Sequence, residues 1–235
     1  SGQCEYWGAG GMCQDLSMPE KRTTYHHGDL RAALVTAGIG LARAGGPQAV
    51  VLREVTRIVG VAPNSAYGHF KTLAALRSAV TVQAQSEMGE AMGRHLDAVA
   101  ATAPADPREA ARVYLREVGR SYVRFALGEP GLFRTAMGGS PAGLRIPGTP
   151  EDIRIAGDRR EPDSFLLRAL IRLIETGDLR REDLGRAVVA HWATVHGLST
   201  MFLDLLAPLS AAERDTMIDD ALDVLIDGFS ARKAG

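Results

Sequence analysis

Residues 59–70 read VGVAPNSAYGHF, and this stretch decides the fold. A short helical pattern that begins at Leu52 ends at Gly60, where the chain must turn sharply. Glycine adopts the positive φ of such a turn without steric cost. Pro63 then suits the first turn of a second helix, because its ring pre-sets the helical φ and it has no N–H to leave unpaired. Two short helices joined by a tight glycine turn are the helix-turn-helix pattern.

The second of these helices, expected over residues 63–70, has side chains that could contact DNA. Val61 is expected to fill the core between the two helices, and Phe70 to anchor the second one. Small polar residues at the beginning of such a helix can reach base edges in the major groove, and tyrosine or histidine near its end can donate to phosphates. The candidate DNA contacts are Arg53, Pro63, Asn64, Ser65, Tyr67, Gly68, His69 and Lys71. The alternative is an ordinary helical corner, with Tyr67 and Phe70 in the core and His69 in solvent.

Charge is distributed unevenly along the chain. Residues 20–83 contain eight Lys and Arg against three acids and have a net charge of +5, although the whole chain carries only −1. A basic unit joined to an acidic remainder is typical of a nucleic-acid module attached to another domain. A division of this size also arises by chance, so charge alone does not identify the partner.

Helical periodicity continues through the rest of the chain, and no convincing strand pattern interrupts it. The sequence predicts an all-α fold of about nine helices, in which Thr72 caps a long fourth helix and Ser210 caps the last one. Residues 1–22 are expected to be a disordered tail, 23–80 a three-helix DNA-binding domain, and 81–235 a second helical domain, to which the family resemblance described below assigns ligand binding and dimerisation. The Gly- and Pro-rich residues 138–162 are predicted to form a flexible loop.

Composition and motifs exclude several classes of protein. Apolar residues make up 46% and charged residues 23%, which is ordinary for a soluble domain. The two cysteines, Cys4 and Cys13, fall in the predicted tail, which fits a reducing compartment. No apolar run is long enough to span a membrane and no secretory signal is recognisable, so a cytoplasmic protein without a membrane partner is expected.

Enzyme and metal signatures are also missing, so no catalytic activity, cofactor or metal is expected. His191 and His196 are five residues apart, which places them about 140° apart around a helix and argues against a shared metal. Four acids of the last helices are interpreted as solvated helix faces: Asp204, Asp219, Asp220 and Asp223.

Three segments resemble a known family. YHHGDLRAALVTAGIGLARAGG (25–46) and LREVTRIVGVAPNSAYGHFKTLAAL (52–76) resemble the DNA-binding domain of the tetracycline-repressor (TetR) family of transcriptional regulators. RAVVAHWATVHGLSTMFL (186–203) resembles the Trp-x-x-x-His-Gly signature of one group of TetR ligand domains, with Trp192, His196 and Gly197 at its three positions.

The resemblance implies a homodimer that binds a near-palindromic double-stranded operator, usually as a repressor released by a small molecule. It assigns phosphate contacts to Tyr67 and His69, and base contacts to residues 63–65 and 68. Thr24 and His26 precede the first helix, where phosphate or minor-groove contact and a solvated N-terminus are both open readings.

The chain departs from the family pattern at three positions. Ala62 stands where the family prefers Ser or Thr as the cap of the recognition helix. Gly68 replaces a larger residue, and Leu73 replaces a phosphate-contacting lysine, for which Lys71 is a substitute. These changes leave open two rival functions: a helical carrier or enzyme whose head no longer reads DNA, and a protein-interaction adaptor.

The effector is expected to be largely apolar, because a pocket in a helical domain has apolar walls and few polar groups. The candidate ligand contacts are Tyr122, Phe125, Phe133, Met137, Trp192, His196 and Met201, with simple core packing as the alternative for each. In the family, two final helices such as those expected at 184–206 and 211–229 meet their copies as a four-helix dimer interface. Gly197 is interpreted as a close-packing position.

Overall fold

The computed structural model describes residues 27–138 and 161–231, and every regular element in these two ranges is a helix. This confirms the predicted all-α fold. The α-helices are α1 (His27–Gly45), α2 (Leu52–Val59), α3 (Pro63–Tyr67), α4 (Leu73–Ala101), α5 (Pro107–Gly128), α6 (Pro130–Met137), α8 (Pro162–Glu175), α9 (Leu184–Asp204) and α10 (Ala211–Ala231). Two short 3-10 helices, η1 (Pro47–Ala49) and η2 (Arg181–Asp183), precede α2 and α9. The predicted tail at 1–22, Thr24, His26 and nearly all of the predicted loop at 138–162 lie outside the described residues.

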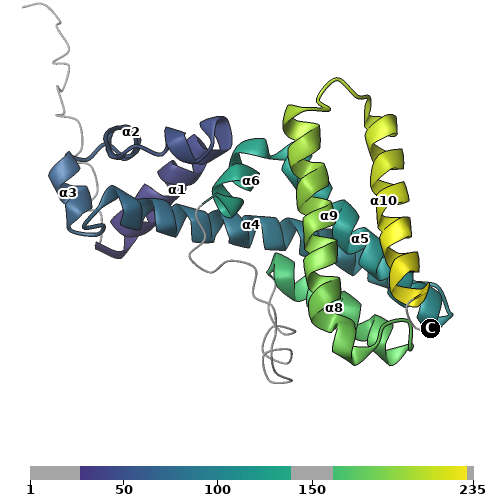
Figure 1. Ribbon diagram of the computed structural model, residues 1–235. Coiled ribbons are helices and arrows are strands. Elements are labelled where there is room, and N and C mark those ends of the chain that lie inside the picture. Colours follow the sequence, from purple (N-terminus) through teal and green to yellow (C-terminus); the bar gives the residue numbers. More distant parts are fainter. Residues whose placement is uncertain (1–26, 139–160, 232–235) are drawn as a thin grey trace, which may run out of the picture.

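The first three helices gather around the beginning of α4 and form a small head (Figure 1). Its core consists of apolar side chains from α1, α2, α3 and α4, among them Leu34, Val55, Ala66, Phe70 and Leu76. Leu132 and Ala136 of α6 belong to the same core. The head is therefore packed directly against a helix that follows α5 in the sequence.

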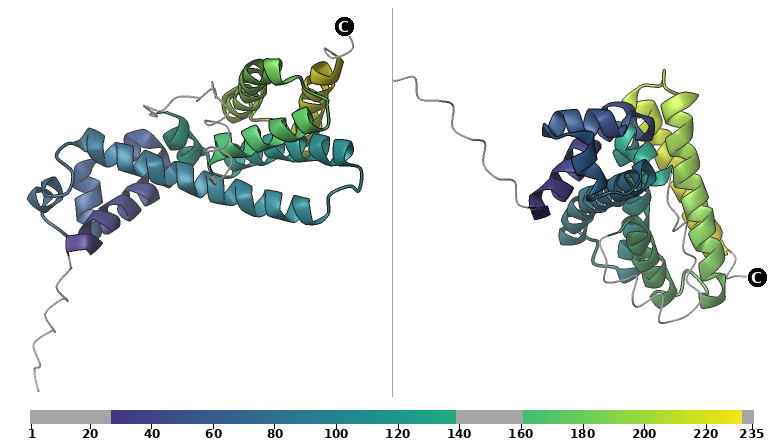
Figure 2. Two further views of the ribbon diagram at one scale, coloured as in Figure 1. Left: turned by 90° about the horizontal axis from the view of Figure 1, so that it is seen from below. Right: turned by 90° about the vertical axis from the view of Figure 1, so that its left-hand side faces the viewer.

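The second core lies around the other end of α4. There α5 runs back along α4 and packs against α8, α9 and α10 (Figure 2). Met88, Met92 and Leu96 contribute the α4 side of this core. One uninterrupted helix of 29 residues thus carries both cores, and the change from one to the other falls between Ala84 and Met88.

Helix ends follow the local sequence closely. The Thr72 hydroxyl accepts from the Ala75 N–H at 3.1 Å, which confirms the predicted cap of α4. At α10, the Glu213 N–H donates to Ser210 Oγ at 3.3 Å and the Ser210 N–H donates to Glu213 Oε2 at 2.8 Å, which is a capping box.

The predicted helix at 63–70 is too long. It ends at Tyr67, and the His69 and Phe70 N–H groups both turn back to the Ala66 carbonyl. Gly68, a poor helix former, stands at the point where the helix stops.

Candidate functional site

The turn between α2 and α3 has the geometry that its sequence requires. Gly60 adopts φ 77° and ψ 32°, in the left-handed region that glycine enters without strain. Its N–H and that of Val61 both donate to the Thr56 carbonyl, which closes the end of α2. Ala62 precedes α3 without a side-chain cap, so the departure from the family pattern leaves this helix end uncapped.

One side of α3 is open to solvent. Pro63, Asn64, Ser65 and Tyr67 are exposed, and Tyr67 retains 51% of its accessible surface. Ala66 is fully buried between them and fills the place predicted for Val61, which is only half-buried. A small alanine inside a short polar run carries no periodic signal, and this is why the sequence did not indicate it.

The residues after α3 differ in burial: one anchors the segment in the core and the others are partly or fully exposed. Phe70 is buried as predicted, and the Arg31 guanidinium lies 5.0 Å from its ring centroid. His69 is half-buried, whereas Gly68, Lys71 and Arg53 of α2 are exposed.

At the beginning of α4, Leu73 is half-buried and packs on the head core. The Arg77 side chain bonds to the head itself, because its Nε donates to the Val50 carbonyl at 2.9 Å. Lys71 and Arg53 therefore remain the candidate cations beside α3 that are open to solvent.

In the second domain, five of the seven candidate ligand contacts come together from three helices. Trp192 and His196 of α9 are stacked, with ring centroids 4.7 Å apart and planes 8° apart. Phe133 of α6 lies 5.7 Å from the His196 ring. The Tyr122 hydroxyl of α5 lies 3.1 Å from His196 Nδ1 and 3.3 Å from Met137 Sδ. These five residues are called the aromatic cluster below.

The aromatic cluster is uncharged near neutral pH. Burial raises the pKa of the Tyr122 phenol above its usual range, because the phenolate would lose its hydration. Burial likewise lowers the pKa of His196, since the imidazolium is the form that loses hydration. The cluster thus offers one hydroxyl and one imidazole within apolar walls.

The two remaining candidates lie elsewhere. Phe125 is half-buried and packs against both cores. Met201 is 41% exposed on the outer face of α9 and does not belong to the aromatic cluster, so its role in ligand binding stays a prediction. It is four residues from Gly197, a position at which an added Cβ would meet nothing within 4 Å. Both residues therefore face outward from the domain and not into its core.

His191 faces a different part of the core from His196, as their spacing predicts. It is 1% exposed, and neither ring nitrogen makes a hydrogen bond of good geometry, although the Leu115 backbone lies close enough to favour the protonated ring slightly. Its Nε2 lies 3.2 Å from the position that a Cβ on Gly119 would occupy, so the ring fits against α5 where the side chain is absent. Among the residues that the structure describes, no group of three or more His, Cys, Asp and Glu could hold a metal ion.

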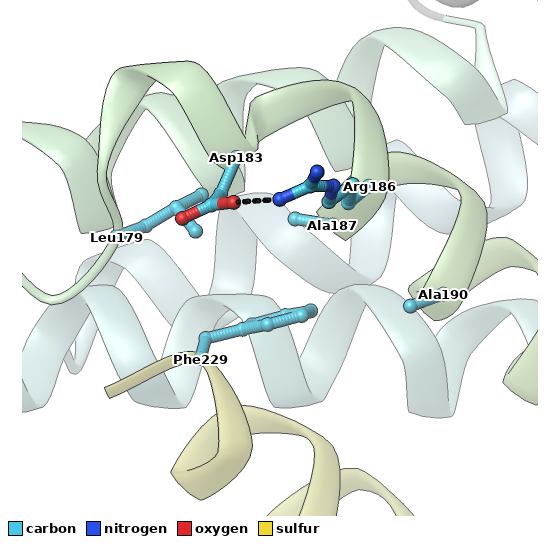
Figure 3. Close-up of a pocket in the computed structure, with 6 residues that line it drawn as sticks. All are labelled: Leu179, Asp183, Arg186, Ala187, Ala190 and Phe229. Atoms are coloured by element: carbon cyan, nitrogen blue, oxygen red, sulfur yellow. Dashed lines mark hydrogen bonds and ion pairs between the residues drawn. The ribbon is translucent and has the colours of Figure 1, made fainter. Parts of the chain in front are cut away.

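A small cavity lies at the opposite end of α9 from Met201 (Figure 3). Its lining residues are Leu179, Asp183, Arg186, Ala187, Ala190 and Phe229. Asp183 accepts from Arg186 Nη1 at 3.0 Å beside the cavity, and Arg180 pairs with the same carboxylate. At about 90 Å³ the cavity holds only a few water molecules, and it includes none of the candidate contacts.

Residues 115–226 match the family described as Tetracyclin repressor-like, C-terminal domain. No curated protein matches the chain. In the described parts of the chain, no helix is both long and apolar enough to cross a membrane.

Solved structures share the fold over most of the chain. A protein of unknown function from Rhodococcus sp. RHA1 is 21% identical, with a TM-score of 0.61 over 89% of this chain and 99% of that one. A TetR variant from Acinetobacter baumannii AYE, in complex with minocycline, is 19% identical, with a TM-score of 0.57 over 90% of this chain and 100% of that one. RolR in complex with resorcinol is 21% identical, with a TM-score of 0.55 over 88% of this chain and 91% of that one. Residues 115–226, just under half of the chain, thus match a tetracyclin repressor-like C-terminal domain, and the chain as a whole shares the fold of these solved structures.

Proposed function

We propose that the protein is a dimeric repressor that binds a palindromic operator and is released from it by a small, largely apolar molecule. The observation that carries the DNA-binding part is the exposed row on α3, where Asn64, Ser65 and Tyr67 follow the left-handed turn at Gly60. Such a helix can enter a major groove, with its first residues at base edges. Tyr67, His69, Lys71 and Arg53 would contact phosphates.

The dimer is assigned to the outer faces of α9 and α10. Large apolar side chains of these helices remain exposed: Val189, Met201, Leu205, Met217 and Val224. On α9, Met201 follows Gly197 by one turn on the same face, and Val189 lies two turns before Gly197, about 80° around the helix, while Leu205 directly follows α9. A second copy of this face would cover them, and Gly197 would permit close approach of the two α9 helices. The heads would then lie on the same side of the dimer and reach successive major grooves.

The effector site is assigned to the aromatic cluster. Minocycline and resorcinol, the ligands of two structural relatives, both carry an aromatic ring with hydroxyl groups. The Tyr122 hydroxyl and His196 imidazole could pair with such groups between apolar walls. We also assign the chain to the Trp-x-x-x-His-Gly group, since Trp192 and His196 of that signature both belong to the cluster.

Release from DNA is assigned to α6. One side of this helix carries Phe133 and Met137 of the cluster, while Leu132 and Ala136 belong to the head core. A ligand that displaces the first pair would shift the second. It releases DNA only if it binds better to the conformation that binds DNA worse. A regulator of this kind acts on the chromosome, and we place it in the cytoplasm.

Selection of duplexes from a random library, followed by affinity at two salt concentrations, tests the proposal. We expect enrichment of a palindrome. For 6–10 phosphate contacts, affinity should fall by about 10³-fold or more between 50 and 200 mM salt. No enrichment at low salt would contradict DNA binding.

Two kinds of substitution then separate phosphate from base contacts. Tyr67→Phe and His69→Ala should weaken binding to all duplexes alike, and Asn64→Ala should change the preferred base. Sedimentation should find all three variants dimeric. Unchanged affinity in the first two would contradict the phosphate contacts.

A further inference from the structure

Four arginines of α5 and four aspartates of α10 form a ladder of ion pairs between these antiparallel helices. The pairs are Arg112–Asp227, Arg116–Asp223, Arg120–Asp219 and Arg124–Asp215. Each set recurs every four residues, so all eight side chains lie along one seam. Arg116 and Arg120 each direct two nitrogens to one carboxylate oxygen. Sliding α10 by one or two residues would separate all four pairs, so the ladder fixes its register on α5.

Two more residues connect this ladder to α4. His95 of α4 donates from Nε2 to Glu117 Oε2 of α5 at 2.7 Å. The other oxygen of Glu117 accepts from Arg120 Nη1 at 2.5 Å. The Glu117 and Arg120 side chains are only 12% and 21% exposed, so solvent screens their attraction less than it would at the surface. A continuous chain of hydrogen bonds, His95–Glu117–Arg120–Asp219, thus joins α4 to α10 through α5.

His95 lies far from the head along α4, so a small change in the angle of α4 at His95 would displace the head. The head core holds the beginning of α4 at Leu76, and the helix runs without interruption to Ala101. The 22 helical steps from Leu73 to His95 span about 33 Å at 1.5 Å per step. A tilt of about 5° at His95 would therefore move the head by about 3 Å. In a dimer both heads move, and the change is large enough to disturb a fit to grooves about 34 Å apart.

We propose that the chain His95–Glu117–Arg120–Asp219 sets the angle of α4 against α10 and thereby the separation of the two DNA-binding heads. His95 and Glu117 are positioning residues for operator binding, which they do not contact themselves. The inference rests on the dimeric regulator proposed above. The competing account is that apolar packing of α4 on α5 sets the angle by itself.

Pulsed dipolar spectroscopy on the full chain tests this without DNA. Cys4 and Cys13 are replaced by serine, and one spin label per protomer is attached at Ile58→Cys, which is 50% exposed in the head. His95→Ala should shift or broaden the distance between the two labels by about 3 Å or more. His95→Gln keeps a donor toward Glu117 and should restore the original distribution. Arg94→Ala, which removes an exposed charge one residue away, is the matched control and should change nothing.

Operators whose half-sites are one base pair closer or farther apart provide the second readout. Wild type should discriminate against them, and His95→Ala should lose at least about threefold of that discrimination because its heads are less fixed. An unchanged label distance in dimeric His95→Ala overturns the proposal and leaves the regulator intact, as does an equal effect of Arg94→Ala. A monomeric wild-type chain would instead contradict the dimer itself.

Discussion

Gly131 of α6 lies directly against the carbonyl group of Ala42 near the end of α1. A Cβ at position 131 would come within 2.3 Å of the Ala42 oxygen and 2.4 Å of the Arg43 oxygen. Backbone oxygens cannot rotate away as a flexible side chain could, so Gly131→Ala must push α6 off the head. We expect this variant to lower the free energy of unfolding by about 2–3 kcal/mol, measured by urea unfolding.

Gly128→Ala is the matched control for that substitution. A Cβ there would meet nothing within 4 Å. Because alanine is the better helix former, the control should be neutral or stabilise by up to about 1 kcal/mol. A similar loss of unfolding free energy in Gly131→Ala and Gly128→Ala would mean that α6 and α1 do not pack as described.

His191 should make the stability of the protein depend on pH. Burial lowers the pKa of its imidazole from 6.5 to about 4. The folded protein therefore excludes a proton that the unfolded chain binds, so stability is complete above about pH 6.5 and declines as the pH falls toward 4. The decline has a slope of about 1.4 kcal/mol per pH unit and totals about 3 kcal/mol.

Urea unfolding at pH 7.5 and 5.0, compared between wild type and His191→Leu, isolates this contribution. The other titrating groups are present in both proteins and cancel in the difference. The variant should lose clearly less stability on acidification. An identical pH dependence would rule out a neutral buried His191.

Gly60 and Gly68 should respond in opposite directions to the same substitution. Gly60 has φ 77°, so Gly60→Ala forces an L side chain into the left-handed region at a cost of about 1 kcal/mol or more. Gly68 has φ −64° and only an ordinary contact with the Ser65 carbonyl at 3.4 Å. Gly68→Ala should therefore raise the thermal midpoint, and Gly60→Ala should lower it. An unchanged or raised midpoint in Gly60→Ala would contradict the left-handed turn at Gly60.

Val224 provides a test of the dimer surface. It is 75% exposed on α10, and Val224→Lys would place a charge in the proposed interface while standing near Asp220 and Asp227 of its own helix. We expect the dimer dissociation constant to rise at least tenfold, about 1.4 kcal/mol, in sedimentation equilibrium. Val82→Lys on α4, where Val82 is 63% exposed, should leave the dimer dissociation constant unchanged. Equal effects would place the interface elsewhere.

The sequence predicted what local chemistry determines. The turn at Gly60, the cap at Thr72 and the capping box at Ser210 each depend on residues a few positions apart. Five of the seven candidate ligand contacts lie together in the aromatic cluster, and the family signature indicates two of them, Trp192 and His196. Their roles in binding remain proposals.

Features that depend on distant pairing were not predicted. Asp219 and Asp223 lie on an exposed helix face as expected, but both also pair with arginines of α5 roughly a hundred residues earlier in the chain, which the sequence did not indicate. Asp204 likewise accepts from Arg134 at 2.7 Å. Met201 follows the family signature in sequence, yet it lies on the exposed side of α9, one turn after Gly197. Periodicity identifies a helix face without saying which partner covers it.

The continuity of α4 has a consequence for hybrid regulators. Between Ala84 and Met88 the same helix leaves one core and enters the other. Inserting a single residue there would turn one core by about 100° relative to the other, so the side chains of one would point into solvent. An insertion of seven residues would nearly restore the phase, within about 20°, and lengthen the helix by about 10 Å. A head transplanted from another protein of this fold must therefore be joined in helical phase, and even a seven-residue step would draw the head core away from Leu132 and Ala136 of α6.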